Sequence, residues 1–338
     1  MKRIVWLDCL KGFLIITVVL GHSIHCSHLQ LEQDFIHDTL WRIIYSFHMP
    51  TFIAVSGYVA YNLDSRGGHF SIPKGILRRF RQLFIPFLLW SLFLFFIQHN
   101  VVHFYDYFIH PNNSLWFLWA LFFISSFFMI IDWISQSCKA PQILLMSLAS
   151  VLLLILMIIL EDAKFLGVEY ISFYFFFYIL GYYFHKYSLI ERLKNEWIIL
   201  AGLIWIILAY FWQAREVPQI MSSVSFLPSG IIIIGYRIMT AIIAIILLLG
   251  IFKKWVGLSP PLAKGLLLLG NVSLGIYAAH MVIRFQLSEY IYMLFPNLTY
   301  WQLLVIIFIS LIVLSYLIVW LLGKWRVTSV WLLGKLNK

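Results

Sequence analysis

The sequence predicts an all-α integral membrane protein, and three features of its composition support this fold class. Of the 338 residues, 62% are hydrophobic and 11% are charged, whereas soluble domains carry about 25% charged residues. Apolar runs of about 20 residues, the length needed to cross roughly 30 Å of hydrocarbon, recur along the chain. The net charge of +10 indicates basic cytoplasmic loops rather than nucleic-acid binding. We therefore expect membrane lipid, and no nucleic acid, as a partner.

Ten apolar segments predict about ten transmembrane helices. They cover residues 8–27, 39–61, 77–98, 114–134, 141–160, 169–187, 197–212, 229–251, 266–290 and 300–322. We expect the first segment to be a retained helix instead of a cleaved signal peptide, because Lys11 interrupts its apolar run and no small-residue cleavage site follows. No internal repeat is visible. We expect a single transmembrane domain over residues 1–338, with no soluble domain appended at either end.

The distribution of basic residues predicts the orientation in the membrane. If the N-terminus is cytoplasmic, 19 of the 24 Lys and Arg residues fall on the cytoplasmic side, where such residues are enriched in membrane proteins. The remaining five are Arg42, Lys164, Arg215, Arg237 and Arg284. Acidic residues favour the opposite side. Both termini are therefore expected in the cytoplasm.

The first segment carries Lys11 and His22 at an informative spacing. Eleven residues turn an α-helix through about 1100°, so the two side chains lie on one face, about 16 Å apart along the axis. Such residues are costly in hydrocarbon and are expected to face the bundle interior or a watery cavity. The spacing fits coenzyme A, because its phosphates would meet the lysine and its thioester would meet the histidine.

Plainer interpretations of these residues stay open. Lys11 can extend its ammonium group to the membrane interface, and His22 can be a hydrogen-bonded interior residue. A metal site built from His22, His25, His28 and Cys26 is not expected, because steps of three residues rotate around a helix rather than converge. The three cysteines are too few for a disulfide framework.

Six segments resemble, in the expected order, those of the membrane-bound acyltransferase 3 family. They are "WLDCLKGFLIITVVLGH" (6–22), "FHMPTFIAVSGY" (47–58), "RRFRQLFIP" (78–86), "SLWFLWALF" (114–122), "FFYILGYYFHK" (176–186) and "NVSLGIYAAH" (271–280). The first holds the family's basic residue and histidine with ten residues between them, here Lys11 and His22. The family more often has arginine at the first of these positions, which weakens any argument for a bidentate phosphate contact there.

The resemblance implies an activity and a location. Within the family the chain looks closest to the stand-alone sugar O-acetylases, a group that includes fucose 4-O-acetylase-like proteins. Such proteins move an acyl group, usually acetyl, from cytoplasmic acetyl-CoA to a hydroxyl of a surface glycan or a lipid-linked saccharide. The resemblance thus implies acetyl-CoA as a donor substrate, no permanently bound cofactor, and a multi-pass location in the bacterial cytoplasmic membrane.

The catalytic and donor-binding residues follow from the resemblance and the predicted orientation. His22 is the catalytic candidate, either as a general base or as a transient acyl carrier; the sequence does not separate these roles. The cytoplasmic ends of the first and third segments supply Lys11, Arg78, Arg79 and Arg81, a cluster suited to the phosphates of coenzyme A. The three arginines fit equally as markers of the cytoplasmic side.

Seven residues in the predicted outer halves of the segments are candidates for binding the acceptor. They are Arg42, His48, Trp116, Tyr174, Arg237, His280 and Arg284. The arginines would bind an anionic acceptor, or they would pair with acidic residues of the bundle. The aromatic residues would stack on a sugar ring, or they would belong to the aromatic belt at the membrane interface.

A transporter or flippase of a glycolipid or small anion is the competing class, because its Arg and His residues would line a substrate path. Transporters often show internal repeats and paired interrupted helices, and the sequence shows neither clearly. A catalytically idle scaffold or sensor is a third class. It would keep its activity when His22 is replaced.

Overall fold

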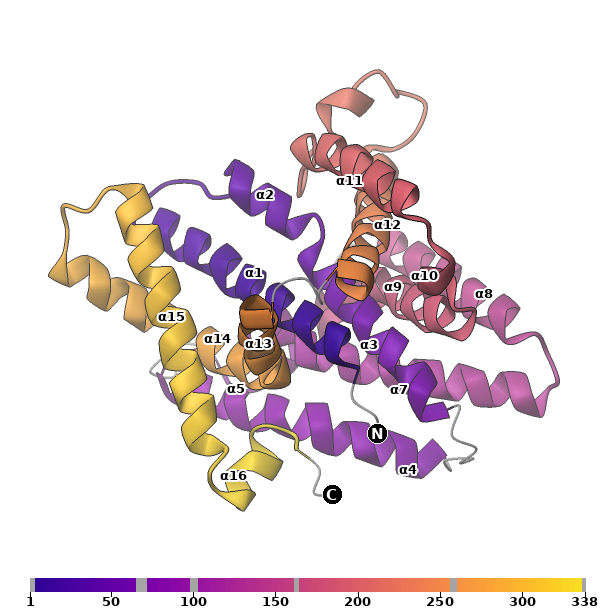
Figure 1. Cartoon of the computed structure of the whole chain (residues 1–338), viewed down its shortest axis with the longest axis horizontal. Coiled ribbons are helices and arrows are strands. Elements are labelled where there is room, and N and C mark those ends of the chain that lie inside the picture. The colour runs from indigo at the N-terminus through magenta and orange to yellow at the C-terminus, as the bar shows by residue number, and fades with distance from the viewer. Residues whose placement is uncertain (1–3, 65–71, 98–102, 161–163, 256–259, 336–338) are drawn as a thin grey trace. The chain divides into compact units, whose positions relative to one another are not determined.

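The computed structural model describes residues 4–64, 72–97, 103–160, 164–255 and 260–335. Within these ranges every regular element is a helix and no strand occurs (Figure 1). The expected all-α fold is therefore confirmed. Four of the basic residues assigned to the cytoplasmic side, Lys2, Arg3, Arg66 and Lys338, lie outside the described ranges.

The α-helices are α1 (Val5–Gln30), α2 (Thr39–Tyr45), α3 (His48–Asp64), α4 (Ile72–Arg79), α5 (Ile85–Ile97), α6 (Asp106–Ile109), α7 (Trp116–Ser137), α8 (Gln142–Ile159), α9 (Val168–Lys186), α10 (Leu189–Arg192), α11 (Asn195–Tyr210), α12 (Ser229–Trp255), α13 (Pro260–Asn271), α14 (Ser273–Leu294), α15 (Tyr300–Leu322) and α16 (Arg326–Trp331). A π-helix, η1 (Phe80–Phe84), joins α4 to α5. Three short 3-10 helices are η2 (Pro111–Asn113), η3 (Phe165–Gly167) and η4 (Gln219–Met221).

Eight stretches of the described residues are long and apolar enough to cross a membrane: Val5–Gln30, Thr39–Tyr61, Ile72–Ile97, Trp116–Ser137, Gln142–Ile159, Phe165–Lys186, Ser229–Lys254 and Tyr300–Leu322. The pair α13 and α14 is a ninth candidate, and α11 is a shorter apolar helix. Each of the ten predicted segments thus overlaps a helix, as expected for a multi-pass membrane protein. The cytoplasmic placement of both termini stays a prediction.

The predicted segment over residues 266–290 is divided between two helices. The helices α13 and α14 meet at an angle of 69°, and Val272 between them leaves the helical region with φ −119° and ψ 13°. The sequence around the break, Gly270-Asn271-Val272-Ser273, fits a helix end followed by a helix start, because glycine and asparagine favour the first and serine the second. Both helices pack against α1.

The close approach of α13 to α1 requires glycine at two positions. A Cβ atom on Gly12 of α1 would lie 2.0 Å from the backbone oxygen of Leu266, and one on Gly270 of α13 would lie 1.8 Å from that of Asp8. Both distances are far below van der Waals contact, and the atoms that are met belong to the backbone. The two helices can therefore touch only where these side chains are absent, which is the packing mode of small residues in membrane bundles.

The helices form two compact units. The first unit holds residues 1–52 and 188–317, and the second holds residues 53–187 and 318–338. The chain passes from one unit to the other within α3, between α9 and α10, and within α15. The expectation of a single domain over residues 1–338 stays a prediction.

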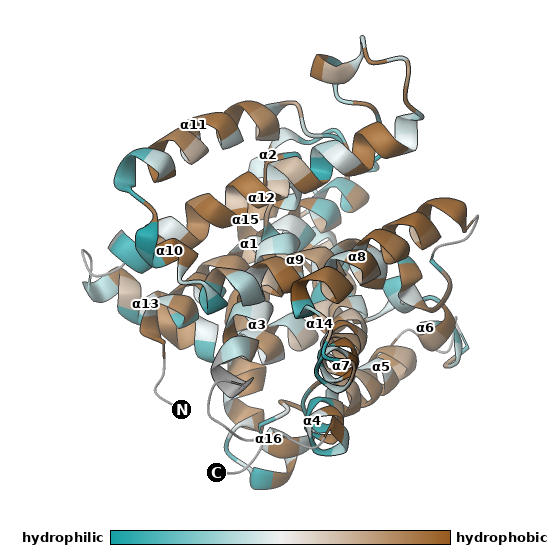
Figure 2. Ribbon diagram, turned by 90° about the vertical axis from the view of Figure 1, so that its right-hand side faces the viewer, coloured by the Kyte–Doolittle hydropathy of each residue, from teal (hydrophilic) through white to brown (hydrophobic). Residues whose placement is uncertain are grey.

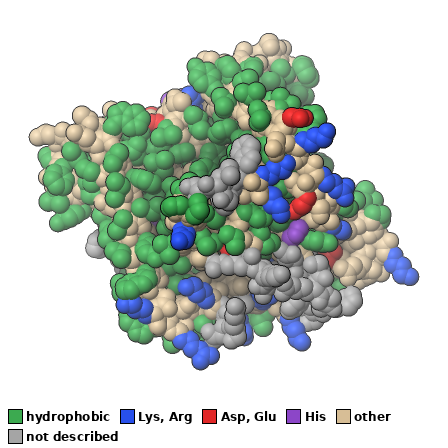
Figure 3. Space-filling view, viewed as in Figure 1, with side chains coloured by type: hydrophobic (Ala, Val, Ile, Leu, Met, Phe, Trp, Pro, Cys, Tyr) green, Lys and Arg blue, Asp and Glu red, His purple; other side chains and the backbone are tan. Residues whose placement is uncertain are grey.

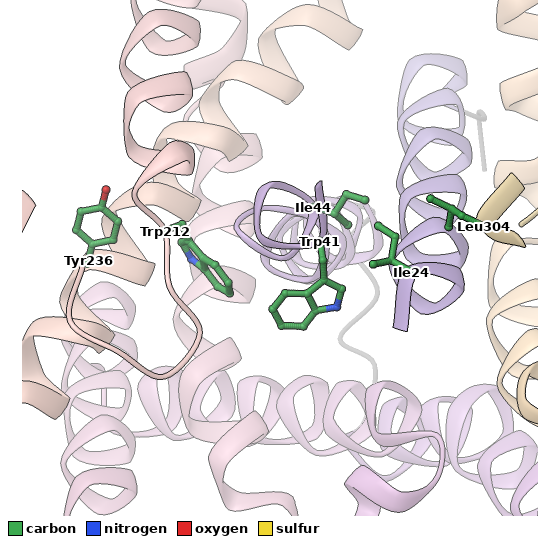
Figure 4. Close-up of a cluster of buried hydrophobic side chains, with 6 residues drawn as sticks. All are labelled: Ile24, Trp41, Ile44, Trp212, Tyr236 and Leu304. Carbon is green, nitrogen blue, oxygen red and sulfur yellow. The ribbon is translucent and has the colours of Figure 1, made fainter. Parts of the chain in front are cut away.

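In the first unit, α1 packs against α2, α12, α13 and α14, and α11 packs against α12. A cluster of buried apolar side chains lies beside α1, and Figure 4 shows its six members: Ile24, Trp41, Ile44, Trp212, Tyr236 and Leu304. The indole rings of Trp41 and Trp212 meet edge to face at 6.2 Å. This cluster holds α2, which follows α1 in the chain, against the loop after α11.

In the second unit, α7 packs against α4, α8 and α9. The helices α3 and α9 also approach closely, since a Cβ atom on Gly57 would lie 1.9 Å from the backbone oxygen of Tyr178. The π-helix η1 precedes Pro86, which has no N–H and cannot donate to the oxygen of Gln82. In the C-terminal segment, Gly334 lies against the backbone oxygen of Gln82. The backbone oxygen of Leu332 accepts a hydrogen bond of 2.9 Å from Trp90 Nε1.

Several helices expose their apolar side chains. Figure 2 shows α8 coloured hydrophobic along most of its length, whereas α4 and α10 carry hydrophilic positions. Hydrophobic side chains cover much of the face drawn in Figure 3. On α8, Leu144, Leu152 and Ile159 are 60%, 56% and 71% exposed. Contact with lipid tails accounts for apolar surface of this extent, which water would disfavour.

Candidate active site

The helix α1 carries the predicted pair, Lys11 and His22, without interruption. Its continuity supports the expected geometry, with both residues on one face and about 16 Å between them along the axis. Lys11 Nζ lies 3.2 Å from Asp8 Oδ1, one turn earlier on the same helix. This ion pair orients the ammonium group while leaving its other N–H groups free to donate.

His22 contacts two residues of α14. Arg284 Nη1 lies 2.6 Å from His22 Nδ1, and the ring of His280 lies 5.2 Å from that of His22 between centroids. His280 and Arg284 are four residues apart, so they project from one face of α14. The cation of Arg284 also lies 4.4 Å from the centroid of the Phe285 ring. The helices α1 and α14 thus contact each other at His22.

Further contacts hold α1 against α14 beside this site. Cys26 Sγ donates to the backbone oxygen of Arg284 at 3.9 Å, and Gln30 Nε2 donates to Ser288 Oγ at 3.4 Å. Both pairs join the part of α1 that follows His22 to the part of α14 that follows His280. The register of the two helices is therefore fixed along the stretch that follows His22 on α1.

Two buried histidines lie around His22 with one ring nitrogen already in use. His280 Nδ1 donates to the backbone oxygen of Ile276 at 2.9 Å, and its Nε2 is buried without a hydrogen-bond partner. His48, the first residue of α3, donates in the same way to the backbone oxygen of Ile44 at 2.7 Å. A carbonyl oxygen only accepts, so Nδ1 carries the proton in both rings and Nε2 is the basic nitrogen.

The loop after α1 is joined to α1 and α15 by the carboxylate of Asp38. Its Oδ1 accepts from the backbone N–H of Trp41 at 2.8 Å and thereby caps α2. Its Oδ2 lies 3.1 Å from His28 Nε2 and accepts from Tyr300 Oη at 2.8 Å. Burial raises the pKa of the Asp38 carboxyl, but the hydrogen bonds from Trp41, His28 and Tyr300 outweigh it, and the pKa is lowered overall.

The predicted donor-binding arginines lie in the second unit. Arg78 and Arg79 end α4, and Arg81 lies in η1. The π-turn therefore begins between Arg78 and Arg81 and widens the helix there; such turns are frequent at functional sites. Arg81 is exposed, and Arg78 and Arg79 are partly exposed. Lys11 belongs to the first unit, so a joint role of these four cations stays a prediction.

The structure places the remaining acceptor candidates in separate surroundings. Arg42 donates to Thr39 Oγ1 at 3.4 Å on α2, and the cation of Arg237 lies 5.8 Å from the Trp212 ring. In the second unit, Trp116 stacks against Tyr170 and Tyr174, with centroid distances of 4.3 and 5.3 Å. Of the seven candidates, His280 and Arg284 contact His22. Acceptor binding by any of them stays a prediction.

The hydrogen bond between Arg284 and His22 was not predicted from the sequence, because it joins residues 262 positions apart. The available signal was the spacing of His280 and Arg284, four residues apart in an apolar segment, which predicts a common helix face. Within the described ranges, no group of three His, Cys, Asp or Glu residues is placed to hold a metal ion.

Comparisons with known proteins agree with the motifs. Residues 4–323 match the family described as acyltransferase domain, the acyltransferase 3 family. Nodulation protein NolL of Sinorhizobium fredii is 32% identical over 128 residues, which cover 36% of this chain and 34% of that protein. NolL of Mesorhizobium japonicum is 30% identical over 123 residues, covering 34% and 32%. The chain thus spans about a third of the length of each relative. No solved structure matches it.

The fold defines a multi-pass membrane protein whose polar residues gather around a histidine of the first helix. Because the family match covers nearly the whole chain, the protein belongs to the acyltransferase 3 family.

Proposed function

We propose that the protein transfers an acyl group, acetyl by family habit, from cytoplasmic acyl-CoA to a hydroxyl of a cell-envelope glycan or a lipid-linked saccharide. One observation carries the proposal: α1 is a single helix that bears a cation and a histidine about 16 Å apart, and the histidine contacts a second helix at Arg284. This spacing matches a ligand with phosphates at one end and a thioester at the other.

The chemistry assigned to His22 is acid–base or nucleophilic catalysis. As a general base, the imidazole takes the proton of the acceptor hydroxyl while that oxygen attacks the thioester carbonyl carbon. The C–S bond then breaks, and the thiolate of coenzyme A takes the proton from the imidazolium. In the second route the imidazole itself attacks the thioester, and the acyl-imidazole passes the acyl group to the hydroxyl. Both routes need His22 and release coenzyme A as a thiol.

The donor site is assigned to the cations and the acceptor site to the polar residues around His22. The cations assigned to donor phosphates are Lys11, held by Asp8, and Arg78, Arg79 and Arg81. The site on α14 and α3 receives the acceptor. The protein acts in the bacterial cytoplasmic membrane, where a cytoplasmic donor and an envelope acceptor can meet at one site.

The test measures binding and turnover of labelled acetyl-CoA by purified protein in nanodiscs. His22→Ala is expected to bind the donor and to lose turnover by about 10²- to 10⁴-fold, the usual contribution of a general base. Lys11→Ala is expected to weaken donor binding about tenfold or more, since it removes a hydrogen bond to a charged group. His37→Ala is the control, because its side chain is 61% exposed.

A transporter or flippase gives a different result. It would show no affinity for acetyl-CoA and no thiol release, and substrate movement across a vesicle membrane would survive His22→Ala. Well-folded wild-type protein with no affinity for any acyl-CoA would remove the donor assignment and place the transporter first. Label retained on wild type but not on His22→Ala would favour the acyl-imidazole route.

A further inference from the structure

The hydrogen bond between Arg284 and His22 determines which nitrogen of His22 carries the proton. An arginine guanidinium has only donors, so His22 Nδ1, 2.6 Å from Arg284 Nη1, must accept with its lone pair. The proton of the neutral imidazole is then on Nε2. The basic nitrogen of the proposed catalytic residue is therefore covered by the cation in this structure.

His280 is the second residue of α14 whose side chain lies beside the His22 ring. Its Nδ1 donates to Ile276, so its Nε2 is a lone pair, and this atom is buried without a partner. The His280 side chain is fully buried, and its ring lies 5.2 Å from that of His22. The N–H on His22 Nε2 and the lone pair on His280 Nε2 are not hydrogen-bonded to each other, so the contact with Arg284 alone assigns Nδ1 as the atom that takes a proton.

Arg284 carries a charge whose surroundings bear on its role. In the part of the chain that the structure describes, no carboxylate lies within ion-pair distance of it, and its Nε is buried without a hydrogen-bond partner. Its guanidinium contacts the imidazole of His22 and the ring of Phe285. A buried charge is normally paired, and guanidinium binds phosphate or carboxylate oxygens with paired hydrogen bonds. An anionic oxygen would therefore compete successfully with His22 for this cation.

We propose that Arg284 caps the basic nitrogen of His22 until an anionic oxygen of the acceptor draws the guanidinium away. The inference rests on the proposed function and adds to it a class of acceptor, one with a phosphate or carboxylate near the accepting hydroxyl. Once Nδ1 is uncovered, it takes the hydroxyl proton while Nε2 keeps its own. Without an acceptor the cap prevents His22 from activating water, so acetyl-CoA is not wasted by hydrolysis.

The direction in which one substitution changes the rate of thiol release distinguishes a cap from a residue that merely orients His22. With acetyl-CoA and no acceptor, Arg284→Gln is expected to raise thiol release about tenfold, the effect of losing one hydrogen bond to a charged group. The double variant Arg284→Gln/His22→Ala should return to background. Arg215→Gln is the control, an exposed arginine of the same unit. Thiol release that is unchanged or lower in Arg284→Gln overturns the inference.

A second measurement uses wild-type protein and does not depend on a variant that folds. Diethylpyrocarbonate acylates imidazole at an unprotonated nitrogen, and mass spectrometry reports the rate at His22. We expect pyrophosphate or glucuronate to accelerate this labelling, and the effective anion distinguishes a phosphate-linked acceptor from a uronic acid. No acceleration by either anion overturns the inference.

The two proposals fail in different ways. Four titratable or charged groups lie close enough to His22 to affect its charge: Arg284, His280, His25 and His48. Both measurements are therefore made at one constant pH. Wild-type protein that does not bind acetyl-CoA removes the proposed function, whereas the labelling experiment still reports whether Arg284 covers Nδ1. Wild-type protein that uses acetyl-CoA through His22, with no response to Arg284→Gln or to anions, removes only the cap.

Discussion

The helices α1 and α8 are both long enough to cross a membrane, yet they are used differently. The most apolar 18-residue stretch of α1 has a mean hydropathy of 1.6, and 67% of its residues are buried. The corresponding stretch of α8 has a mean hydropathy of 2.7, and 11% of its residues are buried. Asp8, Lys11 and His22 lie on α1, and α8 has no charged residue and no histidine. The helix with the weaker membrane signal is thus the one surrounded by protein.

The difference shows where a membrane protein can keep polar groups. A charge facing hydrocarbon costs several kcal/mol, while one facing the bundle can find partners. On α1 the partners are present, since Asp8 pairs with Lys11 and Arg284 contacts His22. Low hydropathy in an otherwise convincing span is therefore a signal of function. High hydropathy, as in α8, indicates a helix whose role is contact with lipid.

The largest predicted effect comes from placing a charge on α8. Leu152→Lys is expected to cost about 3 kcal/mol of apparent insertion free energy, because its 56% exposed side chain faces lipid. Leu152→Ala, which removes bulk without adding charge, should change insertion far less. The measurement is the inserted fraction of α8 in a membrane-insertion assay. Equal insertion of the two variants would show that α8 does not face lipid. It would contradict the contrast between α8 and α1.

A smaller effect is predicted where α1 meets α13. Gly270→Ala is expected to destabilise the protein by about 1–3 kcal/mol, the usual cost of overpacking, because its Cβ atom would meet the backbone oxygen of Asp8 at 1.8 Å. The reason is that backbone atoms cannot rotate away as a side chain can. Thermal unfolding in detergent would measure the loss.

Gly265 on the same helix provides the matched control. Among the described residues outside its own turn of helix, no atom lies within 4 Å of the Cβ that Gly265→Ala would add, and alanine is the better helix former by roughly 0.5–1 kcal/mol. This variant is expected to be neutral or slightly more stable than wild type. If both alanine variants lost stability equally, close packing of α13 on α1 would not be the cause.

The sequence predicted α1 well and the site only in part. The common face of Lys11 and His22 follows from the pitch of a helix, which is a local property. The contact of Arg284 with His22 and the break at Val272 depend on how α14 and α13 pack against α1, and no local pattern specifies packing between segments so far apart in the chain. Spacing therefore predicted which residues share a face, and it could not predict which faces meet.

The smallest predicted effect concerns Asp38, which joins the end of α1 to α2 and α15. Asp38→Asn keeps an oxygen to cap α2 but loses the charge that accepts from His28 and Tyr300, so a loss of about 1 kcal/mol is expected at neutral pH. Because folding lowers the pKa of Asp38, the stabilisation by its carboxylate is complete above the unfolded value of about 3.9. It disappears as the pH falls through the lower folded value.

The difference in unfolding temperature between wild type and Asp38→Asn should therefore be constant near neutral pH and should shrink below about pH 3.9. Tyr300→Phe removes one of the three hydrogen bonds to Asp38 and should show a smaller difference with the same pH dependence. A difference that does not change with pH would mean that the carboxylate charge contributes nothing here. The polar contacts at this end of α1 would then add nothing to stability. The contrast between α1 and α8 would be confined to the surroundings of His22.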